Sequence, residues 1–371
     1  MYWNAGSLIS MRSWQSWRAT VLLEGRIVLT HNLETMKVKL LAPVILVLSW
    51  IVSGQAQPKP NLSQIDRIRL AEAFTLGDAI GNRIWKDWDK APFAVLLVTP
   101  EYEFLIRHPK PTEDFTLIGH DALLKSDVHF RKRQFQTNFQ ATFPAVGGVS
   151  TIVVGQAENT ASKTSTPWVV MLMHEHFHQL QDSQPNFYEQ VAALNLARGD
   201  QSGMWMLNYA FPYDSYEVTQ QFFVMSRLLA DTLKSKENAD FSANLSAYLT
   251  AKQQLREMLS ADDYKYLSFQ LWKEGIARYT EYHVAKLAAT DYKPTKPFAA
   301  LKDFTSFQST ADGVMNRNLS ELSTLELEKS KRVSFYAMGA GEGLSLDRIN
   351  PQWRDRYLID KFSLDTYFKA K

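Results

Sequence analysis

Residues 174–178 of this chain read H-E-H-F-H, and this short run constrains the fold more than any other segment. The preceding run, residues 167–173, is apolar, which favours a helix that continues through the motif. On such a helix His174 and His178 lie one turn apart on one face, where two imidazoles can bind one Zn²⁺. Glu175 can then act as a general base on a water molecule at the metal. The motif therefore predicts a zinc-dependent hydrolase.

Three of the chain's 8 histidines lie within these five residues, a concentration that chance explains poorly. The alternative is a solvated helix face that happens to carry histidines. His176 projects from the opposite face of the helix to His174 and His178. We expect His176 to pack or to support a ligand, and not to bind the metal itself.

The first 56 residues have the pattern of an export signal preceded by an extension. Met36 opens a short basic stretch, residues 40–52 carry no charge, and a small-x-small cleavage site ends at Ala56. We expect a signal peptide over residues 36–56 and a start at Met36, with residues 1–35 as upstream sequence. A genuine N-terminal extension and an uncleaved signal anchor are the alternatives, although the apolar stretch is short for a membrane span. No stable membrane span is expected after cleavage.

Composition narrows the function classes for the remaining residues, 57–371. The leader holds five of the 41 basic residues and two of the 39 acidic ones, which leaves 36 against 37 and a net charge of −1. This balance gives no electrostatic reason to expect a nucleic-acid partner. The chain has no cysteine, which excludes disulfides, a thiolate zinc site and a cysteine nucleophile. An exported protein of this kind is expected in a bacterial periplasm or secreted.

The order of predicted elements indicates an α+β fold with two subdomains. Residues 57–165 are expected to form an α+β subdomain whose last strand borders the cleft, and residues 166–371 a helical subdomain that carries the metal. This layout is zincin-like. The expected helices cover 63–85, 166–182, 188–198, 215–235, 240–259, 262–289 and 333–348, and the expected strands cover 93–98, 102–107, 130–143 and 149–154.

A catalytic zinc needs a third protein ligand and an open fourth position. The next histidine after the motif is His283, too far on for a third histidine at short spacing, so a carboxylate is expected. The best candidate segment is 271–281, which reads L-W-K-E-G-I-A-R-Y-T-E and contains Glu274 and Glu281. Glu281 lies seven residues after Glu274, near the same helix face, and can orient a ligand. Glu217 is the rival third ligand.

This segment resembles the W-x-x-E-G-x-A-x-Y element of the gluzincins, in particular the aminopeptidase N and glycyl aminopeptidase families. The resemblance implies that Glu274 is the third zinc ligand. In those families the glutamate closely follows the HExxH motif, whereas here it lies 96 residues after His178. Several helices would therefore be inserted between the two metal-binding elements. The sequence resembles a remote gluzincin more than a member of either family.

Two further elements resemble the same families and imply roles by that resemblance. Residues 336–339 read Y-A-M-G, similar to their Y-x-K-G element, which implies that Tyr336 stabilises the oxyanion. Residues 155–159 read G-Q-A-E-N, similar to their G-x-M-E-N element, which implies that Glu158 binds a substrate's free α-amine. The alternatives are a buried core tyrosine and a polar loop.

Together these features predict an exported zinc metallopeptidase with a peptide or protein substrate. The role implied for Glu158 would make it an aminopeptidase. The competing hypotheses are an exported zinc-binding protein without peptidase activity and a zinc hydrolase of another amide.

Overall fold

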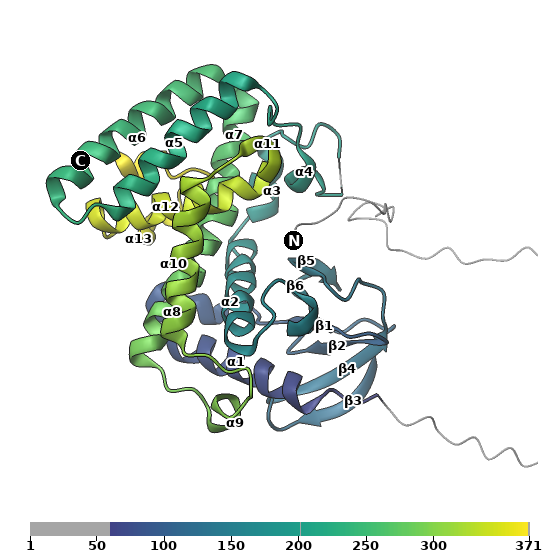
Figure 1. The fold of residues 1–371 in the computed structure, drawn as a ribbon. Helices are drawn as coiled ribbons and strands as arrows, with labels where there is room; N and C mark the ends of the chain where they lie inside the picture. The colour runs from purple at the N-terminus through teal and green to yellow at the C-terminus, as the bar shows by residue number, and fades with distance from the viewer. Residues whose placement is uncertain (1–59, 201, 370–371) are drawn as a thin grey trace, which may run out of the picture. The chain divides into compact units, whose positions relative to one another are not determined.

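The computed structural model describes residues 60–200 and 202–369, which form an α+β fold (Figure 1). One long helix and a six-stranded sheet come first in the chain and a mainly helical region follows, as the order of predicted elements indicated. The predicted signal peptide, 36–56, and the extension before it lie outside the described residues. Among the residues described, no helix is both long and apolar enough to cross a membrane.

The sheet has the strand order β3-β4-β2-β1-β6-β5 and is mixed. β1 pairs antiparallel with β2, so the expected strands 93–98 and 102–107 form a hairpin, and β1 also pairs parallel with β6. The remaining pairs are antiparallel. The strands are β1 (Val95–Val98), β2 (Tyr102–Ile106), β3 (Thr116–Asp121), β4 (Ser126–Lys132), β5 (Gln140–Val146) and β6 (Val149–Gly155).

Two expectations for the strands are wrong. The single strand predicted over 130–143 is two strands, because β4 ends at Lys132 and β5 begins only at Gln140. The connecting loop places Phe135 and Phe139 against the smaller apolar cluster on one face of the sheet, and these aromatic residues produced the misleading alternation. β3 was not predicted, since its residues are mostly exposed and carry little apolar signal.

The strand expected to border a cleft, the last one in the chain, is not an edge strand of the sheet. The last strand, β6, lies inside the sheet between β1 and β5, and β5 is the edge strand (Figure 1). Pro144 within β5 agrees with an edge position, because proline cannot donate a ladder hydrogen bond. Figure 1 shows β5 as the strand nearest the upper helices.

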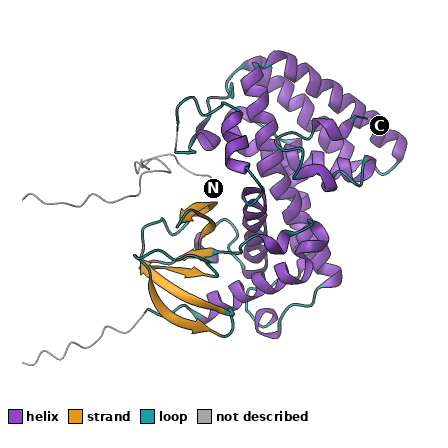
Figure 2. Ribbon diagram, turned by 180° about the vertical axis from the view of Figure 1, so that it is seen from behind, coloured by secondary structure: helices purple, strands orange, loops and turns teal. Residues whose placement is uncertain are grey.

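Alternation along β1 divides the apolar side chains between two faces of the sheet. Val95 and Leu97 belong to the large core that includes the residues of α2, and Leu96 and Val98 belong to the smaller cluster on the other face. Helices α1 and α2 pack together next to the sheet. Figure 2 shows the sheet in orange with these helices beside it.

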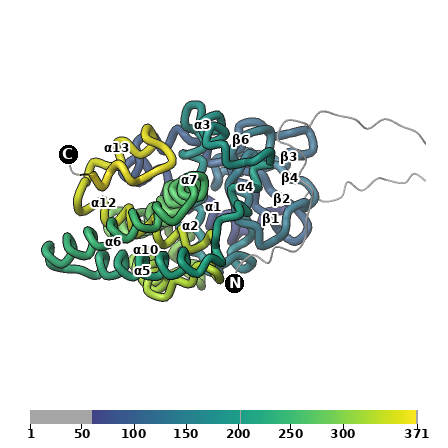
Figure 3. The backbone as a smooth tube through the Cα atoms, turned by 90° about the horizontal axis from the view of Figure 1, so that it is seen from above, coloured from purple at the N-terminus to yellow at the C-terminus, as the bar shows by residue number. Residues whose placement is uncertain are grey.

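The helical region begins with α2 and continues to the C-terminus. Ser63, where the first helix was expected to begin, caps α1 by accepting from the Asp66 amide at 3.1 Å. Helices α5 and α6 form an antiparallel hairpin and run side by side (Figure 3). The longer helices are α1 (Gln64–Ile84), α2 (Ser165–Asp182), α5 (Tyr216–Lys234), α6 (Asn238–Met258), α7 (Ala261–Gln270), α8 (Ile276–Asp291), α10 (Phe307–Ser323) and α12 (Ser334–Ile349). The short ones are α3 (Phe187–Ala193), α4 (Trp205–Asn208), α9 (Lys296–Ala299), α11 (Leu327–Ser330) and α13 (Arg354–Tyr357).

The helix predicted over 262–289 is interrupted. Between α7 and α8 the chain forms one π-helical turn, η3 (Leu271–Gly275), which contains Glu274. Such turns insert an extra residue into a helix and are frequent at functional sites. Helix α10 was not predicted at all, and its outward residues are polar along most of its length.

Candidate metal centre

Helix α2 carries the H-E-H-F-H run with both outer histidines on one side. The apolar run before the motif is buried, and this burial fixes α2 against the sheet and the neighbouring helices. The rings of His174 and His178 lie 5.0 Å apart between centroids. All three histidines of the run are buried, so their polar partners are supplied by the protein.

His176 lies on the opposite side, as expected for a packing residue. Its ring stacks on Phe93 at 3.8 Å and on Trp88 at 5.3 Å between centroids. Its Nδ1 bonds Gln179 Oε1 at 2.9 Å. Burial lowers the pKa of His176 to about 3, so it is a neutral core residue.

Glu274, in the π-helical turn η3, lies beside the two histidines, while the rival Glu217 does not. Single ligand atoms of His174, His178 and Glu274 lie within 4.8 Å of one another, a group that could hold a metal ion. Glu274 Oε2 is 3.4 Å from His178 Nε2, about the ligand separation of a tetrahedral zinc site with bonds of about 2.0–2.1 Å. Glu217 is exposed near the start of α5 and accepts from Ser215 at 3.1 Å.

The charges of this group interact strongly even without an ion. Burial acts to raise the pKa of the Glu274 carboxyl, but His178 and Arg332 outweigh it and hold that pKa well below its usual range. Burial acts to lower the pKa of His178, and Glu274 overcomes it so that the pKa is raised. A carboxylate that stays ionised beside two imidazoles is a donor set suited to Zn²⁺.

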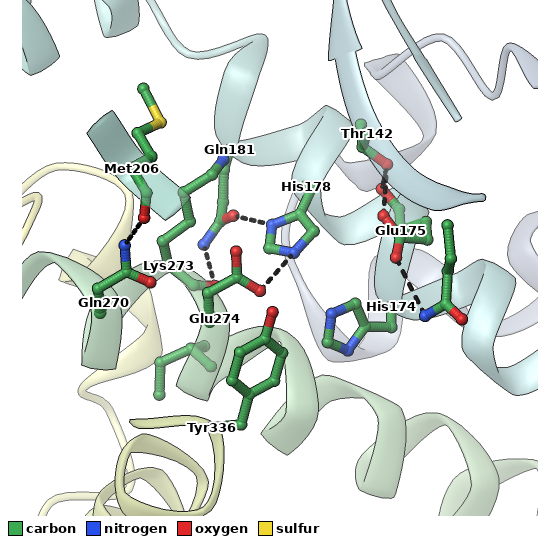
Figure 4. Close-up of polar contacts among 12 residues, drawn as sticks. Thr142, His174, Glu175, His178, Gln181, Met206, Gln270, Lys273, Glu274 and Tyr336 are labelled. Atoms are coloured by element: carbon green, nitrogen blue, oxygen red, sulfur yellow. Dashed lines mark hydrogen bonds and ion pairs between the residues drawn. The ribbon is translucent and has the colours of Figure 1, made fainter. Parts of the chain in front are cut away.

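A polar side chain lies beside the Nδ1 atom of each histidine. His178 Nδ1 donates to Gln181 Oε1 at 2.7 Å, which leaves Nε2 facing Glu274 (Figure 4). His174 Nδ1 lies 3.6 Å from Glu281 Oε2, which brings Glu281 to the place expected of an orienting carboxylate. The donor atoms left facing the centre are therefore two Nε2 atoms and one carboxylate, and they fit a zinc ion.

Gln181 also connects α2 to the turn that carries Glu274. Its Nε2 donates to the carbonyl oxygen of Lys273 at 3.1 Å and to Tyr357 Oη at 2.7 Å. One side chain therefore holds His178 and the backbone next to Glu274 in a fixed relation. Sequence reasoning missed Gln181, although its position three residues after His178 places it on the same helix face.

Glu175 points to the edge strand of the sheet. Thr142 Oγ1 of β5 lies 2.7 Å from Glu175 Oε2 and 3.0 Å from its carbonyl oxygen, and its single proton serves one of them at a time. Gln140 Nε2 approaches Glu175 Oε1 at 3.5 Å. Thr142 and Gln140 were not predicted, because the pairing of β5 with the motif depends on tertiary packing.

Tyr336 on α12 reaches the same group. Its ring is nearly parallel to that of His174, at 6.2 Å between centroids, and Figure 4 shows its hydroxyl directed toward Glu274. Arg332 Nη1 donates to Tyr336 Oη at 2.9 Å. Tyr336 is only partly buried within an otherwise buried stretch of α12, so it is not an ordinary core tyrosine.

Two glycines allow α12 to approach Glu274 so closely. A Cβ on Gly275 would lie 2.4 Å from the Cα of Gly339, and one on Gly339 would lie 2.7 Å from the Cα of Gly275. Gly275, which follows Glu274, and Gly339, which lies three residues after Tyr336, therefore pack directly against each other. Any larger residue at either position would separate the carboxylate from the phenol.

Glu158 is not brought to this group. It follows β6 in the turn η2 (Ala157–Asn159), as expected from its place in the chain, but its carboxylate pairs with Arg69 Nη1 at 2.8 Å. Arg69 in turn bonds Ser165 at the first turn of α2. His174 is nine residues further along the helix, a rise of about 13 Å. Glu158 therefore lies at the opposite end of the helix segment from the candidate ligands.

No protein-family model, curated protein or solved structure matches this chain in the comparisons made.

Proposed function

We propose that the chain is an exported zinc-dependent peptidase. The observation that carries the proposal is the convergence of His174, His178 and Glu274, from elements 96 residues apart, with Glu175 and Tyr336 beside them. His174, His178 and Glu274 would hold the ion, in a zincin-like arrangement. Zinc bound there supplies Lewis acidity, which polarises a carbonyl and makes water a stronger acid. Export is supported by the basic stretch that begins at Met36, the apolar segment 40–52 and the small-x-small site ending at Ala56.

Glu175 serves as the general base in this proposal. Thr142 donates to one of its oxygens and Gln140 approaches the other, so the carboxylate is held in one orientation while it accepts a proton from the attacking water. The same carboxylate then returns the proton to the leaving amine. Tyr336 donates its O–H to the oxygen that becomes negative during attack.

An extended peptide is the substrate that the surroundings favour. β5 is an edge strand, and the Thr142 side chain within it contacts Glu175, the residue next to the candidate ligand His174. Edge strands present unpaired N–H and C=O groups that an extended chain can pair with. The aminopeptidase reading loses its support, because Glu158 is paired with Arg69 at the other end of α2.

The test compares Glu175→Gln with wild type and with Glu217→Gln, a matched change at an exposed glutamate. Zinc content is measured by elemental analysis, and a peptide mixture is digested with and without a chelator and read by mass spectrometry. We expect all three proteins to bind one zinc, and Glu175→Gln to lose roughly 10²- to 10⁴-fold in rate, the usual contribution of a general base. Retained turnover in Glu175→Gln, or turnover that a chelator leaves unchanged, would refute the proposal.

A further inference from the structure

Arg332 lies beside the candidate metal centre with few partners for its charge. It precedes Tyr336 by one helical turn, and among the described residues its guanidinium makes one hydrogen bond, to Tyr336 Oη. Its nearest carboxylate is Glu274, at 3.5 Å, and the side chain is 20% exposed. A guanidinium has five N–H donors, so most of the hydrogen-bonding capacity of Arg332 is left for other partners.

The two other arginines near the centre are neutralised differently. Arg278 forms a short ion pair with Glu321, and Arg317 pairs with Glu281 at 2.8 Å. Neither of those carboxylates belongs to the candidate ligand group. Glu274, the carboxylate near Arg332, does belong to that group, and a bound divalent cation would offset its charge. The charges of the divalent ion, Arg332, Glu274 and Glu175 would then leave one net positive charge.

The phenols around Arg332 do not supply the missing negative charge. Burial raises the pKa of Tyr213 to about 12, although Arg332 acts to lower it. Burial likewise raises the pKa of Tyr266, and Arg332 opposes it. Tyr213 and Tyr266 are therefore neutral at pH 7. Glu274 remains the nearest carboxylate to Arg332.

We propose that Arg332 forms a subsite for a carboxylate of the substrate, with the Tyr336 hydroxyl beside it. Guanidinium groups bind carboxylates through two parallel hydrogen bonds, and the partly exposed position of Arg332 allows such access. The inference rests on the proposed peptidase function, and it assigns the substrate as a peptide with a negative charge near the scissile bond.

The distance limits where that charge lies in the substrate. Arg332 Nη1 is 3.5 Å from Oε1 of Glu274, and Oε2 of the same carboxylate is 3.4 Å from His178 Nε2, so the guanidinium lies directly beside the residues that would hold the ion. An extended peptide advances about 3.3 Å per residue. The carboxylate is therefore one or two residues from the carbonyl that is attacked. It is either the free C-terminus or the side chain of an aspartate or glutamate.

The test uses one cleavable peptide in four forms, with a free or amidated C-terminus and with aspartate or asparagine next to the scissile bond. The zinc-loaded full chain is compared with Arg332→Gln, Arg332→Lys and Lys331→Gln, which removes an adjacent exposed charge. We expect wild type and Lys331→Gln to favour one carboxylate form by roughly 10- to 100-fold in kcat/KM, the range of a hydrogen bond to a charged group. Arg332→Gln should abolish the preference, mainly through KM, and Arg332→Lys should restore part of it.

Loss of the preference on amidation identifies the C-terminus, and loss on the aspartate-to-asparagine change identifies a side chain. Equal cleavage of all four forms by wild type, or a preference that survives in Arg332→Gln, overturns the subsite while the peptidase proposal stands. If wild type cleaves none of them, the peptidase proposal fails, and calorimetric binding of the same peptides tests the subsite separately. Tighter binding of an acid form that Arg332→Gln abolishes supports the subsite, and equal binding of acid and neutral forms overturns it.

Discussion

Gln181 offers a direct test of how the candidate metal centre is assembled. Its side chain makes three close hydrogen bonds, with His178 Nδ1 at 2.7 Å, Tyr357 Oη at 2.7 Å and the Lys273 carbonyl at 3.1 Å. The first orients a candidate ligand, and the last fixes the backbone beside Glu274. A Gln181→Met variant keeps nearly the same volume and removes all three bonds.

Gln179 provides a matched control on the same helix. It is equally buried and also makes three bonds, with His176 Nδ1 at 2.9 Å and with the carbonyls of Ala94 and Ser150 at 3.0 and 2.8 Å. None of those partners is a candidate ligand. At about 1 kcal/mol per hydrogen bond, we expect Gln179→Met and Gln181→Met each to lower the free energy of unfolding of the metal-free protein by about 3 kcal/mol.

The two variants should differ in metal affinity. Removal of a residue that orients a metal ligand usually weakens binding by about 10- to 100-fold. We expect a loss of that size for Gln181→Met and less than a few-fold change for Gln179→Met. The assay is competition for Zn²⁺ with a chromophoric chelator, at a temperature at which circular dichroism shows both variants folded. Equal zinc affinity in the two variants would refute the claim that Gln181 links His178 to Glu274.

Three other predictions follow from single contacts. His176→Leu should keep wild-type zinc stoichiometry by elemental analysis, because His176 is stacked in the core away from the ligand group. Gly275→Ala should lower the free energy of urea unfolding by about 1–3 kcal/mol or more, since its Cβ would strike Gly339, whereas Gly313→Ala, which meets open space, should not destabilise. Burial acts to raise the pKa of Asp347, but its hydrogen bonds hold that pKa below 3.8, so the stability it adds is complete above pH 3.8 and is lost as pH falls through the folded-state pKa. The gap in urea midpoint between wild type and Asp347→Asn should therefore be present at pH 7 and shrink below pH 3.8.

The local parts of the fold and site could be predicted because their causes are local. The apolar run before His174 and the spacing to His178 specify a helix and one ligand-bearing face, and Ser63 specifies the start of α1. The different environments of His176 and His178 followed from helical periodicity alone. These features need no knowledge of which elements pack against each other.

The remaining parts depend on packing between distant segments. Thr142 reaches Glu175 only because β5, and not β6, is the edge strand, and that order is a property of the whole sheet. Thr142 is a contact that the sequence did not predict, whereas Glu158 was expected near the metal ligands and does not lie there. Its place in the chain, just before the metal-bearing helix, suggested proximity, yet nine residues of helix separate the start of α2 from His174 and carry it about 13 Å away.

The long separation between His178 and Glu274 is weak evidence against their forming one site. The entropy cost of closing a loop rises slowly with length, so that a fourfold longer connection costs only about 1.2 kcal/mol more. Each of the contacts that close this connection contributes a free energy similar in size to that cost, and the contacts act together. Gln181 bonds the Lys273 backbone, Lys273 Nζ pairs with Asp182 at 3.0 Å, and the neighbouring Trp272 stacks on Tyr357 at 4.9 Å. Helices α3 to α7 can therefore be accommodated between the two segments, because buried contacts and not chain proximity hold Glu274 beside His178.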